Sequence, residues 1–66
     1  MQISLNGENK EINDGSTLAE LIAEMQLGDI RYAVEINEEL IPRSEHGDHV
    51  LNAGDEIEVV KAIGGG

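Results

Sequence analysis

A helical hydrophobic pattern occurs in one segment of the chain, TLAELIAEM at residues 17–25. Thr17 and Glu20 match a capping box, in which each side chain hydrogen-bonds the other residue's backbone N–H at the start of a helix. Glu24 joins Glu20 on the polar face, and Gly28 is expected to end the helix. The apolar residues repeat at the spacing of a single helical face: Leu18, Leu21, Ile22 and Met25. We therefore expect a helix that covers a sheet with one of its faces.

Before this helix, the sequence predicts a β-hairpin. Residues 2–5 alternate polar and apolar, and the alternation resumes over residues 10–13. The Asn6-Gly7 pair between them supplies the positive φ angles that a tight turn between twisted strands requires. Because side chains alternate with a period of two, one face of the hairpin receives Ile3, Leu5 and Ile12.

After the helix, the sequence predicts two strands and a short edge strand. Residues 32–36 alternate in polarity, residues 37–39 have the composition of a turn, and residues 56–63 form the longest strand-like run. Leu40-Ile41 is a short apolar piece between them. Because Pro42 cannot donate a hydrogen bond to a neighbouring strand, this piece is confined to an edge or an end.

This order of elements predicts an α+β fold, with one main helix on one face of a mixed sheet of four to five strands. Ile57 and Val59 are expected to face the helix, and Val60 and Ala62 the opposite side. That opposite side would be mildly apolar at its centre and acidic around it. Such a face suits docking, and it is equally typical of the ordinary exposed side of a half-covered sheet.

The size and composition of the chain favour one soluble domain. Sixty-six residues are too few for two domains, so we assign residues 1–63 to the domain and 64–66 to a flexible C-terminal glycine tail. Cysteine is absent, so no disulfide, zinc thiolate or side-chain persulfide can form. The apolar runs are short and the N-terminus shows no signal-peptide pattern. We therefore expect a cytoplasmic protein.

The chain is strongly acidic, with a formal net charge of −10 from fourteen acids. The only cations are Lys10, Arg31, Arg43 and Lys61, and their spread along the sequence indicates no basic patch. Nucleic acid and anionic membranes would repel such a protein, so neither is expected as a partner. The acidic excess either steers the chain to a basic partner or simply solvates its exterior, and we favour the second interpretation.

Catalytic side-chain types gather only in a polar loop. The loop contains Ser44, Glu45, His46, Asp48 and His49. A catalytic triad needs groups that converge from separate elements around a pocket, and zinc needs three or four rigidly held ligands. We therefore predict no catalytic residue and no metal site, and interpret both histidines as surface residues.

The three terminal glycines are chemically more informative. Gly64, Gly65 and Gly66 lack Cβ atoms, so they can thread a slot too narrow for side chains. At about 3.3 to 3.6 Å per residue, they can carry the terminal carboxylate on the order of 10 Å beyond the last strand. An α-carboxylate is an unreactive anion at neutral pH, so acyl chemistry would require a partner enzyme to convert it to a mixed anhydride with ATP. The alternative is a frayed end without function.

Three features coincide along the chain: the strand-hairpin-helix opening, the Gly54-Asp55-x-Ile57 motif before the last strand, and the closing Gly65-Gly66. Together they resemble the ThiS family, the sulfur-carrier proteins of thiamin biosynthesis, which have the ubiquitin-like β-grasp fold. The resemblance covers the whole chain. The diglycine is shared with related carriers, but the Asn-x-x-x-Ile-Pro-Arg segment at residues 37–43 points to ThiS in particular. Further matches are Met1-Gln2-Ile3, Asp14-Gly15-Ser16-Thr17-Leu18 and Ile36-Asn37.

The resemblance implies a carrier rather than an enzyme. A ThiF-like adenylating enzyme would activate Gly66 with ATP and magnesium, and sulfur relayed from cysteine by a desulfurase would convert the acyl-adenylate to a thiocarboxylate. A ThiG-like thiazole synthase would receive this sulfur. The chain itself would bind no cofactor. Gly64 and Gly65 would thread the partner's channel, although a third glycine departs from the family pattern and loosens the tail. The interface would include Val60, Ala62 and Ile63.

Three other functions stay open on the sequence. The small subunit of molybdopterin synthase is also a β-grasp protein with a terminal diglycine, although such chains are generally longer. A ubiquitin-like modifier would join its C-terminus to lysines of target proteins. A plain β-grasp binding module would leave the tail idle.

Overall fold

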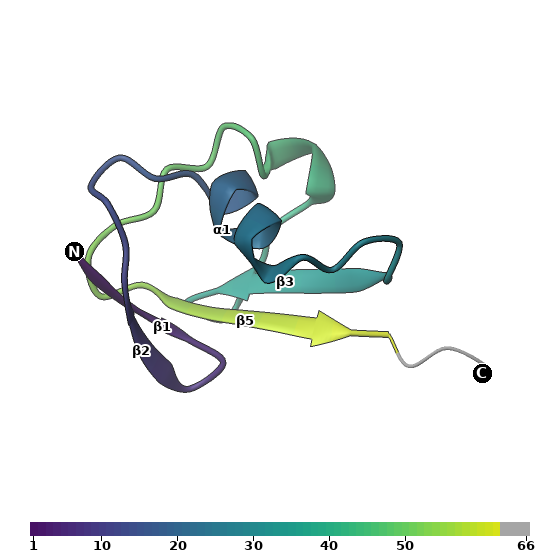
Figure 1. The fold of residues 1–66 in the computed structure, drawn as a ribbon, viewed down its shortest axis with the longest axis horizontal. Coiled ribbons are helices and arrows are strands. Elements are labelled where there is room, and N and C mark those ends of the chain that lie inside the picture. Colours follow the sequence, from purple (N-terminus) through teal and green to yellow (C-terminus); the bar gives the residue numbers. More distant parts are fainter. Residues whose placement is uncertain (63–66) are drawn as a thin grey trace.

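The computed structural model of the chain describes residues 1–62, which form a five-stranded sheet with one α-helix on one face (Figure 1). This arrangement confirms the predicted α+β fold. Residues 63–66 lie outside the described part of the chain, so the division into a domain at 1–63 and a tail at 64–66 stays a prediction. The elements are β1 (Gln2–Leu5), β2 (Glu8–Glu11), α1 (Leu18–Met25), β3 (Tyr32–Ile36), β4 (Glu39–Leu40), the 3-10 helix η1 (Arg43–Glu45) and β5 (Glu56–Lys61).

The last strand of the sequence is the middle strand of the sheet. The strands lie in the order β2-β1-β5-β3-β4. β5 runs parallel to β1 and antiparallel to β3, while β2 and β4 form antiparallel edges. The sheet is therefore mixed, and the short β4 lies at an edge, as Pro42 predicted.

The hairpin between β1 and β2 has the predicted turn. Asn6 and Gly7 both adopt positive φ angles, 51° and 84°, which is the geometry of a tight two-residue turn. The second strand begins at Glu8, two residues before the segment predicted from the sequence. The side chain of Asn6 also accepts a hydrogen bond from the backbone N–H of Val59 at 2.8 Å. This contact ties the hairpin turn to β5.

The capping box at the start of α1 is confirmed. The backbone N–H of Thr17 donates to the Glu20 carboxylate at 3.0 Å, and the N–H of Glu20 donates to the Thr17 hydroxyl at 3.2 Å. The predicted end at Gly28 is wrong, because the helix stops at Met25. Gln26 takes the left-handed conformation (φ 53°) and donates its N–H to the carbonyl of Ala23.

The hydrophobic core lies between α1 and the sheet. As predicted, Ile57 and Val59 of β5 are buried under the helix, with 1% and 6% of their surface exposed, whereas Val60 is 55% exposed on the opposite face. None of the elements within residues 1–62 covers that opposite face (Figure 1). The core is entirely aliphatic: Ile3, Ile12, Leu18, Leu21, Ile22, Leu27, Val34, Ile36, Ile41, Leu51, Ile57 and Val59.

The same substitution at two consecutive residues of β5 tests this one-sided burial. Val59→Thr places a hydroxyl in the core, and we expect it to lower the free energy of unfolding by about 1–3 kcal/mol. Val60→Thr is the matched control, because threonine keeps the β-branched shape and its hydroxyl meets water; we expect less than about 0.5 kcal/mol. Urea denaturation measures both. Equal losses would contradict the assignment of the two faces.

The capping box can be tested by comparing Thr17→Ala with Thr17→Ser. Alanine removes the hydroxyl that accepts from Glu20, and we expect a loss of about 1 kcal/mol in the free energy of unfolding. Serine keeps the hydroxyl, so it should retain most of the stability. Urea denaturation followed by far-UV circular dichroism is the measurement. A serine variant as unstable as the alanine variant would show that the hydroxyl is not the stabilising group.

Candidate functional site

The end of β5 positions the segment that leads to the terminal glycines. Within β5 and β3, Lys61 lies opposite Tyr32. One residue further, the backbone N–H of Ala62 donates to the carbonyl of Arg31 at 2.8 Å. We call Lys61 and Ala62 the tail root. The chain is therefore hydrogen-bonded up to the last described residue, where Figure 1 shows the end of β5 beside the start of β3.

The predicted interface residues fall partly within the described chain. Val60 lies on the uncovered face of the sheet, opposite Ala33 of β3, and Ala62 is exposed. Glu35 and Glu58 face each other on the same side, two residues further along the strands. The uncovered face thus has the expected mixture of small apolar and acidic side chains.

The remaining site residues from the sequence are Ile63, Gly64, Gly65 and Gly66. They lie outside the described residues, so their roles at the interface, in the channel and in acyl chemistry stay predictions.

The two histidines of the polar loop have different surroundings. His46 is buried, with 7% of its surface exposed, so its interpretation as a surface residue is wrong. Its Nε2 lies 3.1 Å from the carbonyl oxygen of Ile41, and its ring stacks on Tyr32 with 6.2 Å between ring centres. His49 is partly exposed. Over residues 1–62, no group of three or more potential metal ligands occurs.

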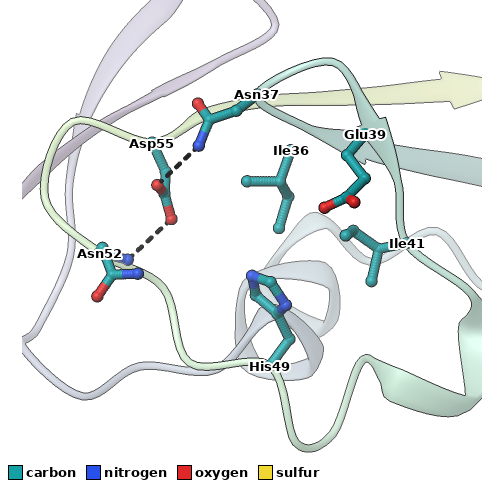
Figure 2. Close-up of a pocket in the computed structure, with 7 residues that line it drawn as sticks. All are labelled: Ile36, Asn37, Glu39, Ile41, His49, Asn52 and Asp55. Atoms are coloured by element: carbon teal, nitrogen blue, oxygen red, sulfur yellow. Dashed lines mark hydrogen bonds between the residues drawn. The ribbon is translucent and has the colours of Figure 1, made fainter.

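A depression of about 380 Å³ lies beside His49, and the contacts in it are structural (Figure 2). The buried carboxylate of Asp55 accepts hydrogen bonds from the side-chain amide of Asn37 at 3.2 Å and from the backbone N–H of Asn52 at 2.8 Å. The side-chain oxygen of Asn37 accepts from the N–H of Glu56 at 3.0 Å. These bonds fasten the β3–β4 turn to the start of β5.

This network explains the structural role of two motifs described in the sequence analysis. Asp55 belongs to the Gly-Asp-x-Ile motif, and Asn37 begins the Asn-x-x-x-Ile-Pro-Arg segment. The sequence identified both residues but gave no signal that they hydrogen-bond each other, because they lie eighteen positions apart in the chain. Their hydrogen bonds close the sheet at the start of β5.

The cations are less scattered in space than in the sequence. The guanidinium carbon of Arg43 lies 4.6 Å from the centre of the Tyr32 ring. Lys61 is paired with Tyr32 across the strands, and Arg31 precedes Tyr32 in the chain. Three of the four basic residues therefore lie at or near the tail root: Arg31, Arg43 and Lys61 itself. In the described part of the chain, no helix is long and apolar enough to cross a membrane.

Comparison with known proteins shows similarity over the whole chain. The model of the ThiS family matches residues 3–66. The sulfur carrier protein ThiS of Escherichia coli is 30% identical over 66 residues, and the match covers all of both chains. Thiazole synthases of Paramagnetospirillum magneticum and Magnetococcus marinus are 35% and 41% identical over 66 residues. This chain spans only 20% of the length of each thiazole synthase.

A solved structure shows the same fold. The crystal structure of the thiamine biosynthesis protein ThiS from Geobacter metallireducens superposes with a TM-score of 0.84, covers all of both chains and is 23% identical. At that identity the likeness concerns the fold alone. The match of the family model to nearly the whole sequence carries the assignment, and on this basis the chain belongs to the ThiS family.

Proposed function

We propose that this chain is a sulfur carrier of thiamin biosynthesis, a protein cosubstrate rather than an enzyme. Membership of the ThiS family is the observation that carries the proposal. The similarity to the sulfur carrier protein ThiS of E. coli supports it, because the two chains align over their full lengths. The absence of cysteine adds a chemical reason, since the chain has no side chain on which it could carry sulfur as a persulfide.

The proposed working group is the carboxylate of Gly66. As an anion it resists nucleophiles, so a partner enzyme must first join it to the α-phosphate of ATP and release pyrophosphate. A sulfur nucleophile then attacks the acyl carbon and AMP leaves. If the sulfur arrives as a protein persulfide, a thiol must reduce the resulting acyl disulfide to give the thiocarboxylate. Magnesium and ATP belong to the partner, and this chain supplies only the acyl group.

The fold supports delivery of this group. β5 is hydrogen-bonded on both edges, and Ala62 continues the pairing by donating to Arg31. Residues 63–66, when extended, can span on the order of 13 Å beyond that point. Gly64 and Gly65 would enter a narrow channel of the adenylating enzyme, and Val60, Ala62 and Ile63 would contact the surface around it.

The proposed partners follow from the chemistry and from the relatives. A ThiF-like enzyme would adenylate the carrier, a cysteine desulfurase or another donor would provide sulfur, and a ThiG-like thiazole synthase would consume it. The two thiazole synthases that contain a segment similar to this chain support the last pairing, because one polypeptide there combines both parts. All these reactions would take place in the cytoplasm.

Deletion of Gly66 tests the role of the terminus. The shortened chain would hold its carboxylate about 3.5 Å too far from the nucleotide. Because a misplacement of 1 Å can cost a reaction about a hundredfold in rate, we expect ATP–pyrophosphate exchange with the adenylating enzyme to fall at least that far. The thermal unfolding midpoint should not change. Exchange at the original rate in the shortened chain would refute the assigned role.

Two valines of nearly equal exposure test the proposed interface. Val60 is 55% exposed on the uncovered sheet face, and Val50 is 51% exposed in the loop before β5. We expect Val60→Asp to raise the KM for the carrier in the exchange assay about tenfold or more, because it places a charge in a desolvated contact. Val50→Asp is the control and should leave KM within about twofold. Equal effects of the two variants would contradict the location of the interface.

A further inference from the structure

Three of the four cations in this acidic chain gather at one end of the sheet. Arg31 precedes β3, Lys61 ends β5 opposite Tyr32, and Arg43 begins η1 with its guanidinium over the Tyr32 ring. All three side chains are exposed. Figure 1 shows the end of β5 beside the start of β3, and η1 on the α1 side of the sheet. We call Arg31, Arg43 and Lys61 the basic collar.

Arg43 is held in place by a series of packed side chains. Pro42 caps η1, and Arg43 is the first residue of that turn. The guanidinium lies 4.6 Å from the centre of the Tyr32 ring, a distance at which the ring attracts the cation. Tyr32 in turn stacks on the buried His46, whose ring binds the carbonyl of Ile41. The Ile41-Pro42-Arg43 motif thus holds a cation beside the tail root.

The collar cations have no acidic partner within the described residues. The ion pairs formed there by side chains or the N-terminus are Met1 with Glu11 and Asp14, and Lys10 with Glu24. Asp29 and Glu45 are near the collar in the sequence, yet no carboxylate of residues 1–62 lies within 4 Å of a collar cation. In a chain with fourteen acids, these three positive charges remain available to another molecule.

We propose that the basic collar docks on an acidic rim of the adenylating partner, around the channel that admits the glycine tail. This inference rests on the proposed function and adds the chemistry of the contact. Charges at the rim of an interface chiefly set the orientation and rate of encounter. Because the rest of the molecule is acidic, an acidic rim would repel every approach except the one that presents the tail.

The geometry favours a protein surface over the phosphates of ATP. Gly66 must reach the nucleotide, and an extended tail places it on the order of 13 Å from Ala62. The collar lies at the tail root, so we place it at the mouth of the channel instead. Nucleic acid is a poorer fit, because a net charge of −10 repels a polyphosphate backbone.

Neutralisation of the collar tests the proposal. The triple variant Arg31→Gln, Arg43→Gln, Lys61→Gln is compared with Lys10→Gln, which removes the cation on β2. We expect the triple variant to raise the KM for the carrier in ATP–pyrophosphate exchange about tenfold at low ionic strength, with kcat unchanged. High salt should remove most of this difference. Lys10→Gln should behave like the wild type, and Arg43→Lys should keep its KM within about twofold.

Direct binding of the chain to the adenylating enzyme without ATP, measured by calorimetry, gives a second readout. If the triple variant is unfolded, the double variant Arg31→Gln, Lys61→Gln carries the test, because it leaves the Tyr32 stack intact. If the wild type supports exchange and the neutralised variant has the same KM, the collar proposal is wrong and the proposed function is unaffected. If the wild type neither binds the adenylating enzyme nor supports exchange, both the proposed function and the collar proposal are wrong.

Discussion

The structure depends on the pairing of β5 with neighbours on both edges. β5 is the last strand of the chain and the middle strand of the sheet, parallel to β1 and antiparallel to β3. Its inward residues Ile57 and Val59 are buried under α1, and its end at Lys61 reaches the end of the sheet. The hairpin, the helix and β3 all contribute to holding this one strand. The described structure therefore fixes the point from which the terminal residues depart.

The residues by which the chain resembles its family have mostly structural roles. Asp55 and Asn37 join the β3–β4 turn to the start of β5, and Arg43 packs on Tyr32 through a cation–π contact. These side chains help to determine the fold and the surroundings of the tail root. The proposed acyl chemistry uses none of them, because it takes place at Gly66 in the nucleotide site of another protein.

Local sequence patterns predicted the secondary-structure elements well, but they did not predict contacts between residues that are distant in the sequence. The Thr17–Glu20 capping box and the Asn6-Gly7 turn are determined by neighbouring residues, so the sequence located both correctly. The end of α1 was missed because Gln26 adopted the left-handed conformation in place of the expected glycine. The burial of His46 also depends on contacts with other elements, which no local pattern reveals.

The same limit applies to the candidate site. Alternation correctly placed Val60 on the uncovered face, but the gathering of three cations requires the strand order, which pattern alone cannot prove. The central claim concerns the terminus, and intact mass spectrometry tests it directly. After incubation with ATP, magnesium, the adenylating enzyme and a sulfur source, we expect the chain to gain the mass difference between sulfur and oxygen, located at Gly66. An unchanged mass, in a reaction where the same enzyme converts an established carrier, would contradict the account.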